Sequence, residues 1–252
     1  KGNQFITADY NSVSNTELCT QITNKDDVRV QTIEHLMAAL AGTGVHNALI
    51  EIDGPEVPIL DGSSQEFVKK ILSVGKKALN VPVNGFKVAK SIIVTNGSAW
   101  AKFTPAEVLS IEFYIDYSDT VIGRQNLSLS MKNGTFVREL CDSRTFCRES
   151  DISSLKSKGF AKGGTLNNAI VLQSDKVQNS EGLRRFDECV RHKMLDAMGD
   201  LSLAGGPILA AYSSNLGGHT LTNRLLHAAF SDPEAIVPVQ IPENQATQLP
   251  GF

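Results

Sequence analysis

Residues 186–201, FDECVRHKMLDAMGDL, form the segment that most restricts how this chain can fold. Apolar residues with helical spacing predict an amphipathic helix packed on one side, and they are Phe186, Val190, Met194, Ala197 and Leu201. Residues four apart lie on nearly the same side of a helix, so His192, Asp196 and Asp200 form a second, polar stripe. Lys193 is adjacent to His192. We therefore expect a hydrophobic core on one side of this helix, and the charged groups beside the apolar stripe require a separate explanation.

The polar stripe has two interpretations. One is a solvated face, because Asp, His and Lys are common on helix surfaces. The other is a metal site, because the i, i+4 spacing of His192 and Asp196 directs an imidazole and a carboxylate to one point. A nitrogen and oxygen ligand set of this kind suits Zn²⁺. The spacing alone does not decide between the two.

A catalytic zinc site also needs a third protein ligand and a base that takes a proton from water. The segment TIEHL, residues 32–36, offers both in adjacent positions. We expect Glu34 to be the base and His35 to be the ligand. The alternative for His35 is a hydrogen-bonded histidine in the core.

A further histidine stands in NLGGHTLTN, residues 215–223. Two glycines precede His219 at an expected helix start, where they allow close approach of a ligand and leave the side chain at the mouth of a site. The alternative is a plain turn with a polar residue at the helix start. For His46 and His227 we expect ordinary core positions.

Strand patterns and helix patterns occur in separate blocks along the chain. The predicted strands are a hairpin at 17–31 and the segments 47–53, 86–97, 99–105, 108–117, 168–172 and 206–214. The predicted helices are 33–44, 63–75, 149–159, 186–201 and 217–232. This order favours an α+β fold with antiparallel or mixed sheets layered against helices, rather than a doubly wound parallel sheet. The Pro- and Asn-containing stretch 79–85 predicts a boundary between a first domain, 1–82, and a second domain, 83–252.

Composition excludes several classes of protein. The chain has 24 Lys and Arg against 27 Asp and Glu, so its net charge of -3 provides no field that would favour nucleic acid. No run of about 20 apolar residues predicts a transmembrane helix. The four cysteines form no CxxC pair, which favours a reducing compartment. We expect a cytoplasmic protein, and a monomer is the simplest state.

Six segments together resemble one enzyme family. In chain order they are TIEHLMAAL, PILDGS, SRTF, KGGTLNNAIV, RHKMLDAMGDL and GGHTLTN. As a set, and over about Glu17 to Phe230, they resemble the zinc-dependent UDP-3-O-acyl-N-acetylglucosamine deacetylases of lipid A biosynthesis. This resemblance favours the metal interpretation of the polar stripe.

The resemblance implies two α+β domains with the active site in the cleft between them. It implies Zn²⁺ as the cofactor, held by His35, His192 and Asp196 together with water, and it leaves open whether Fe²⁺ replaces zinc in the cell. The implied reaction is hydrolysis of the N-acetyl group of UDP-3-O-(3-hydroxyacyl)-N-acetylglucosamine, the committed step of lipid A biosynthesis. The implied partner is thus a small UDP-sugar lipid precursor.

The resemblance also implies roles for the acid and base groups. Glu34 is the expected general base, and the Thr145 hydroxyl is an expected stabiliser of the tetrahedral oxyanion. His219, cationic and oriented by Asp200, is expected to protonate the leaving amine. Acetate and the free glucosamine nucleotide are the products.

Substrate-binding residues follow from the same resemblance. Lys193 is expected to neutralise phosphate or hydroxyl groups of the substrate. Asp116 and Tyr117 stand where the family has an Asp-Phe pair that contacts the nucleoside, and a tyrosine ring keeps the ability to stack on uracil. Further substrate contacts are expected from Phe146, and from Ile152 and Leu166 in the segment that lines the family's acyl-chain passage. For the last two, ordinary core packing is the alternative.

The chain also departs from its expected family. Relatives begin with a further strand segment that is not found here, so we expect the first domain to lack N-terminal strands. Cys147 and Arg148 stand where many relatives have Gly and Phe, which makes the rim of the cleft more polar. A catalytically silent relative or fragment that binds a sugar nucleotide or a protein is therefore one alternative. A zinc hydrolase of another amide, such as a peptidase, is a second, and the absence of an H-E-x-x-H motif argues against it.

Overall fold

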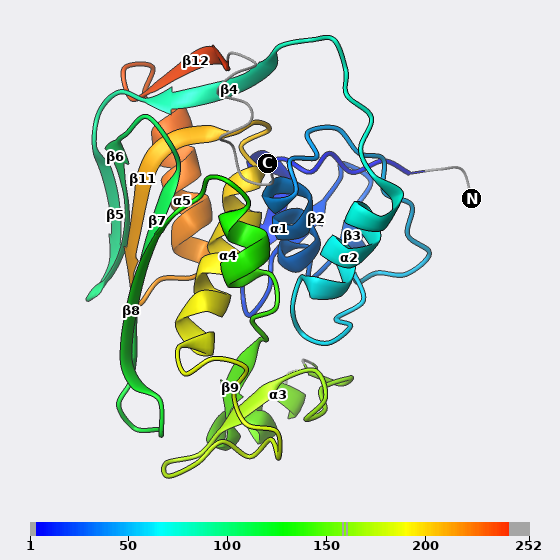
Figure 1. Cartoon of the computed structure of the whole chain (residues 1–252), viewed down its shortest axis with the longest axis vertical. Helices are drawn as coiled ribbons and strands as arrows, with labels where there is room; N and C mark the ends of the chain where they lie inside the picture. The colour runs from blue at the N-terminus through cyan, green and yellow to red at the C-terminus, as the bar shows by residue number, and fades with distance from the viewer. Residues whose placement is uncertain (1–3, 158, 160, 242–252) are drawn as a thin grey trace.

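The computed structural model describes residues 4–157, 159 and 161–241, and its architecture is α+β, as predicted. A large sheet lies at one side, and α4 (Glu188–Ser202) and α5 (His219–Phe230) pack against it (Figure 1). On the other side of α4 lie α1 (Glu34–Gly42), α2 (Gln65–Val74) and a small sheet (Figure 1). Helix α4 is therefore at the centre of the molecule.

The large sheet has seven strands and is mixed. In sheet order its main path is β12 (Ile236–Ile241), β4 (Val83–Val88), β11 (Ile208–Asn215), β6 (Ala99–Pro105) and β5 (Ile92–Asn96), while β7 (Ser110–Tyr117) pairs with both β11 and β8 (Gly123–Ser130). Strand β11 runs parallel to β4 and β7 and antiparallel to β6. This arrangement differs from a doubly wound parallel sheet.

Strand β7 shows why this sheet packs on the helices. Its sequence alternates, and Ile111, Phe113 and Ile115 are buried while the residues between them are more exposed. These side chains belong to the same core as Val190, Met194, Ala197 and Leu201 of α4. The end of β7, with Asp116 and Tyr117, is thereby fixed relative to α4.

The N-terminal part contains the predicted hairpin. It begins with a short 3₁₀ helix, η1 (Tyr10–Ser12), and a three-stranded sheet of β1 (Val13–Asn15), β2 (Gln21–Thr23) and β3 (Arg29–Val30). Strands β2 and β3 are antiparallel, and the Asn24 side chain accepts hydrogen bonds from the backbone N–H groups of Asp26 and Val28 in the turn between them. Helix α1 follows directly.

Between β8 and α4 the described chain forms five short elements, and Phe136, Leu140, Ile170 and Leu172 of this region belong to the main hydrophobic core. These elements are η2, a π-helix (Phe136–Leu140), β9 (Phe146–Arg148), η3, a 3₁₀ helix (Glu149–Asp151), α3 (Ile152–Ser157) and β10 (Ile170–Leu172). Strands β9 and β10 pair in parallel. The chain thus forms a π-helix and then a short strand before it reaches α3.

Several sequence predictions about single elements were wrong. Residues 47–53 form no strand, and no segment of the described chain pairs with them. Phe186 precedes the first residue of α4 and is 85% exposed, so it contributes nothing to the apolar stripe. The sequence reading also missed β8 and β12. Strand β12 contains Pro238, which an edge strand tolerates because no ladder hydrogen bond is needed from one of its sides.

The predicted boundary at residues 82 and 83 coincides with the start of β4 at Val83. Ala38, Ala39 and Val68 nevertheless lie in the same hydrophobic core as α4, so packing continues across the boundary. The division into two domains stays a prediction. Within the described part of the chain, no helix combines the length and apolar character that crossing a bilayer requires.

Candidate metal centre and active site

Helices α1 and α4 meet at a glycine. A Cβ atom on Gly199 would lie 2.1 Å from the carbonyl oxygen of Glu34, far inside van der Waals contact. Only glycine therefore allows the N-terminus of α1 to approach α4 this closely. The approach brings Glu34 and His35 beside Asp196, which precedes Gly199 by one turn of α4.

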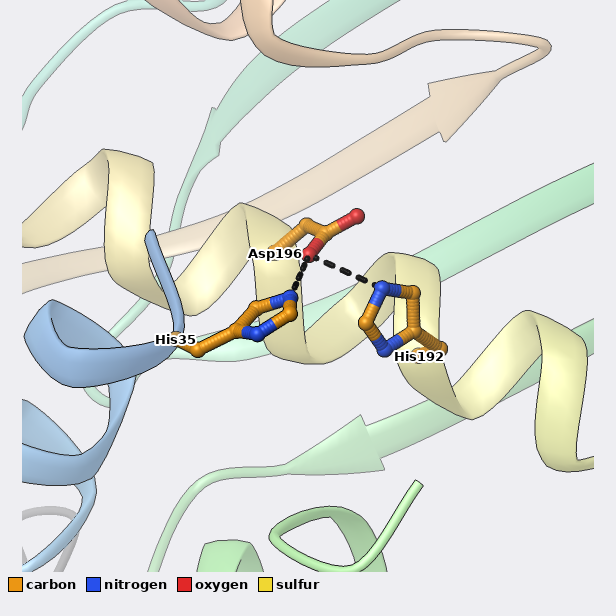
Figure 2. A group of neighbouring side chains, drawn as sticks. All are labelled: His35, His192 and Asp196. Atoms are coloured by element: carbon orange, nitrogen blue, oxygen red, sulfur yellow. Dashed lines mark ion pairs between the residues drawn. The ribbon is translucent and has the colours of Figure 1, made fainter. Parts of the chain in front are cut away.

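This contact assembles a cluster of three buried side chains. His35 comes from α1, and His192 and Asp196 come from α4; one ligand atom of each lies within 4.8 Å of the others (Figure 2). Oδ1 of Asp196 lies 3.5 Å from Nε2 of His35 and 3.3 Å from Nε2 of His192. All three residues are at most 5% exposed. The solvated-face interpretation of the polar stripe is therefore wrong.

The hydrogen bonds of the cluster fit a metal ion. Oδ1 of Asp196 is buried and has no hydrogen-bond partner among the described residues, although a buried carboxylate oxygen normally has one. Nδ1 of His192 lies 3.0 Å from the carbonyl oxygen of Ser143, a contact that places the proton on Nδ1 and leaves the Nε2 lone pair towards Asp196. Imidazole nitrogen and carboxylate oxygen in this arrangement form an incomplete coordination shell.

Charges in the cluster support the same interpretation. Burial lowers the pKa of His192 to about 4, so the imidazole is neutral at physiological pH, as a ligand must be. Burial alone would raise the pKa of Asp196, but His192 and Lys193 lower it well below the usual range of aspartate. Nζ of Lys193 lies 2.8 Å from Oδ2 of Asp196. Asp196 is therefore ionised and leaves Oδ1 for a cation.

Glu34 is the buried carboxylate next to His35. Its Oε2 accepts a hydrogen bond from the backbone N–H of Thr20 at 3.0 Å, and burial raises its pKa above the usual value. A carboxylate with a raised pKa is a stronger base than an ordinary surface glutamate. Glu34 is the first residue of α1, so the helix start that places His35 next to Asp196 also places Glu34 beside them.

His219 forms a buried pair with Asp200. Its Nδ1 lies 2.8 Å from Oδ2 of Asp200, and the other carboxylate oxygen accepts a 2.6 Å hydrogen bond from the Thr20 hydroxyl. Burial opposes the charged imidazole, but Asp200 outweighs it and, with Glu34, raises the pKa of His219 to about 9. The expectation that Asp200 orients a cationic His219 agrees with this geometry.

Thr145 lies on the loop that supports His192. Its backbone N–H donates to the carbonyl oxygen of Gly62 at 2.7 Å, and its carbonyl accepts from the N–H of Ile170 at 2.8 Å. Ser143, two residues earlier, supplies the carbonyl that faces His192. Thr145 is thus held by backbone contacts on both sides, and its side chain is half-buried.

A pocket of about 280 Å³ contains most of the expected nucleotide contacts. Its lining residues are Ile115, Asp116, Tyr117, Arg148, Lys193, Leu216 and Gly217. Phe146 connects this pocket with the metal cluster, because its ring packs edge-on against Tyr117 at 5.2 Å and against His192 at 6.1 Å. The expected substrate residues Asp116, Tyr117 and Lys193 therefore share one site.

Ile152 and Leu166 were expected along the acyl-chain passage, and neither lines the nucleotide pocket. Ile152 begins α3 and is half-buried, and Leu166 is 40% exposed. The two remaining histidines differ from expectation. His46 and His227 are exposed rather than buried, and His227 packs edge-on against Tyr10 at 5.0 Å.

Sequence reasoning missed two sets of supporting residues. Thr20 contacts both Glu34 and Asp200, and nothing in the segment around it indicates this role. Arg144 and Glu188 form a buried ion pair at 2.9 Å, and the Arg144 backbone N–H also donates to Glu188. This pair fixes the loop that presents Ser143 to His192. Arg144 is the arginine of the SRTF segment, and a buried charge requires a partner, but its burial is not visible in the sequence.

Comparison with known proteins agrees with this geometry. The family model described as LpxC, UDP-3-O-acyl N-acetylglycosamine deacetylase, matches residues 1–231. A UDP-3-O-acyl-N-acetylglucosamine deacetylase of Pasteurella multocida (strain Pm70) is 41% identical over 241 residues, covering 95% of this chain and 79% of that protein. A protein of the same name from Histophilus somni (strain 129Pt) is 43% identical over 230 residues, covering 90% and 75%.

A third relative of that name, from Photobacterium profundum, is 41% identical over 230 residues and covers 90% of this chain and 76% of its own length. Each of these matches spans most of the chain, and the family match includes all three residues of the cluster. The chain belongs to the family of UDP-3-O-acyl-N-acetylglucosamine deacetylases.

Proposed function

We propose that this chain hydrolyses the N-acetyl group of UDP-3-O-(3-hydroxyacyl)-N-acetylglucosamine, releasing acetate and the free amine, a step of lipid A biosynthesis. One observation carries this proposal: the ligand atoms of His35, His192 and Asp196 lie within 4.8 Å of one another, and Glu34 directly precedes His35 in the chain. Asp200 lies on α4, the helix that carries His192 and Asp196, and its buried partner His219 is the first residue of α5. A metal site, a base and an acid are thereby available to one amide bond.

The donor set supports Zn²⁺ as the metal. Two imidazole nitrogens and one carboxylate oxygen are typical of catalytic zinc sites, which use three protein ligands and keep one position open. When bound, the ion would lower the pKa of water and polarise the acetamide carbonyl. Fe²⁺ accepts the same donors, so the metal used in the cell is a separate question.

Glu34 is the proposed general base. The Thr20 N–H occupies Oε2, which leaves Oε1 to take a proton from the attacking water. Burial raises the pKa of this carboxylate, so its proton affinity is better matched to neutral pH. Attack on the carbonyl carbon places negative charge on the acetamide oxygen, and we assign the Thr145 hydroxyl to that oxygen as a hydrogen-bond donor.

His219 is the proposed general acid. With a pKa of about 9 its imidazole carries a proton at neutral pH, and Asp200 holds Nδ1, so Nε2 is the nitrogen that donates to the leaving amine. Protonation of the amine allows the C–N bond to break and acetate to leave. Base and acid are thus separate residues with different charges.

The nucleotide end of the substrate fits the pocket at the end of β7. Asp116 and Tyr117 are proposed to contact the nucleoside, and Lys193 to neutralise the substrate's phosphate or hydroxyl groups. The Phe146 ring packs against Tyr117 of this pocket and against His192 of the metal cluster. For Ile152 and Leu166, contact with the acyl chain stays a prediction, as do the monomeric state and the location in the cytoplasm.

The two-domain division is supported by the origin of the ligands. Glu34 and His35 precede residue 82, whereas His192, Asp196 and His219 follow it. We therefore infer that the site lies between a first domain, 1–82, and a second, 83–252. Relative movement of the two would change the distances within the metal cluster.

The experiment that tests the proposal measures acetate release by the wild-type chain and by Glu34→Gln. The variant should keep its metal and lose about 100-fold or more of kcat, because it removes the base but no ligand. Glu66→Gln is a matched control, since Glu66 is also in the first turn of a helix, but its side chain is 43% exposed and pairs with Lys69. Unchanged turnover in Glu34→Gln would exclude Glu34 as the base.

A further inference from the structure

Two basic residues line the pocket at the end of β7, Arg148 and Lys193. Lys193 stands beside the metal cluster, where Nζ lies 2.8 Å from Oδ2 of Asp196. Arg148 is the last residue of β9, and its side chain pairs with Asp119 instead. The position of Arg148 in the pocket therefore calls for a reason of its own.

Arg148 is held in one orientation by two neighbours. Its Nε and Nη2 donate to the two carboxylate oxygens of Asp119 at 2.7 Å and 3.0 Å. Its guanidinium carbon lies 4.2 Å from the centre of the Tyr117 ring. A flexible side chain fixed on both a carboxylate and an aromatic face loses less freedom when it binds a ligand.

The Arg148 guanidinium has hydrogen-bond donors that Asp119 does not use. Among the described residues none accepts a hydrogen bond from Nη1, and the Arg148 side chain is 30% exposed. Both N–H groups of Nη1 are thus available to an anion at the pocket. Arginine binds phosphate oxygens with short, charge-assisted hydrogen bonds, often in pairs.

The position of Arg148 also changes what Tyr117 can do. One face of the Tyr117 ring is covered by the guanidinium, and the Phe146 ring packs edge-on at 5.2 Å. A uracil ring cannot stack on the covered face. A nucleotide that enters from that side meets the guanidinium rather than the phenol ring.

The acidic group of the pocket does not cancel this charge. Asp116 accepts hydrogen bonds from Arg124, with Nε at 2.8 Å, and from Ser118, so its carboxylate is already paired. Asp119 is outside the pocket lining and occupies only one edge of Arg148. The free edge of Arg148 and the ammonium of Lys193 are the positive groups that a ligand in this pocket encounters.

We propose that Arg148 is a specificity-determining residue that binds the diphosphate of the nucleotide substrate in this pocket, together with Lys193. The inference rests on the proposed function, which makes the substrate a UDP-sugar. It assigns the phosphate oxygens to Nη1 of Arg148 and leaves the nucleoside to other parts of the pocket. Affinity for a nucleotide should then depend on its phosphates more than on its base.

The test is a binding titration of the purified full chain with UDP and, separately, with uridine. Arg148→Met keeps a side chain of similar length over Tyr117 but removes the charge and the donors. We expect UDP to bind about tenfold more weakly to the variant, the typical contribution of a charged hydrogen bond, while uridine changes by less than about twofold. Arg148→Lys should lie between the two, because it keeps the charge without the fork of donors.

Arg29→Met is the matched control. Arg29 is also bound by both oxygens of a neighbouring carboxylate, Asp27, but it lies on β3. Its substitution should leave both affinities unchanged. With the complete substrate, Arg148→Met should raise KM about tenfold and leave kcat within about twofold, a division that loss of folding would not produce.

Equal affinity of wild type and Arg148→Met for UDP would overturn the inference, and so would an equal loss for UDP and uridine, which would assign Arg148 to the nucleoside. The proposed function fails in a different way. A wild-type chain that binds UDP through Arg148 but releases no acetate would contradict the deacetylase activity and leave the nucleotide site intact.

Discussion

Nδ1 of His219 lies 2.8 Å from Oδ2 of Asp200, and both side chains are buried. Asp200 stands on α4 one turn after Asp196, so a single helix supplies two of the proposed metal ligands and the carboxylate paired with the proposed general acid. In the proposed mechanism, the i, i+4 spacing of His192, Asp196 and Asp200 therefore serves both the metal site and the general acid. The rigidity of α4 would fix the proposed metal position relative to the proposed acid.

This relationship predicts a pH effect. Asp200→Asn removes the negative charge that holds the pKa of His219 at about 9, so the pKa should fall. If His219 is the general acid, as proposed, catalysis needs its protonated form, and activity is lost as pH rises through its pKa. The alkaline limb of kcat/KM against pH should therefore begin near pH 9 in the wild type and at lower pH in Asp200→Asn. An alkaline limb that does not move would assign the acid to another group.

Thr20 provides a second prediction, because its N–H contacts Glu34 and its hydroxyl contacts Asp200. Thr20→Val keeps the shape and the N–H but removes the hydroxyl, and we expect kcat to fall about tenfold as Asp200 loses a charge-assisted hydrogen bond. Thr20→Ser should restore activity. In an Asp200→Asn background, Thr20→Val should lower kcat by a much smaller factor, and a double-mutant cycle measures this difference.

Thr43→Val is the control for this change. Thr43 is also buried and its hydroxyl donates to the carbonyl of Ala39, at the far end of α1 from the site. The two Thr→Val variants should lose similar thermal stability, while kcat falls only for Thr20→Val. Equal kcat in both would show that Thr20 has only a structural role.

Gly199 provides a third prediction. Gly199→Ala places a Cβ where the Glu34 carbonyl oxygen would be 2.1 Å away, so α1 must move away from α4. We expect the free energy of unfolding to fall by about 1–3 kcal/mol, as for other overpacked cores, and metal affinity to fall with it. Gly54→Ala is a control, because nothing lies within 4 Å of the added atom there. Unchanged metal affinity in Gly199→Ala would show that the metal site does not depend on the close contact between α1 and α4.

The sequence predicted the metal cluster because its main signal is local. The spacing of His192 and Asp196 is set by one helix, and Glu34 and His35 are adjacent in the chain. The resemblance to a family then joined the two segments, which helical periodicity could not do. The contacts of Thr20 could not be predicted in this way, since its hydroxyl reaches a residue 180 positions away.

The sequence predicted those helices and strands whose pattern lies within one element. It missed the strands that form only because they pair with a distant segment. Strand β7 alternates clearly and was predicted, whereas β12 carries Pro238 and is a strand because it pairs with β4 at the sheet edge. The segment 47–53 shows the reverse case, since its apolar residues suggest a strand but no described neighbour pairs with it. Pairing is a property of the tertiary structure that periodicity does not contain.

The measurement that tests the central claim most directly is a zinc titration of the metal-free chain, with acetate release followed in the same samples. The account predicts that activity rises in proportion to added Zn²⁺ and reaches its full value at one equivalent. With one equivalent of added Zn²⁺, His192→Ala should bind no zinc and release no acetate. Full acetate release without metal, or one tightly held equivalent of zinc in His192→Ala, would contradict the assignment of His35, His192 and Asp196 as the catalytic metal site.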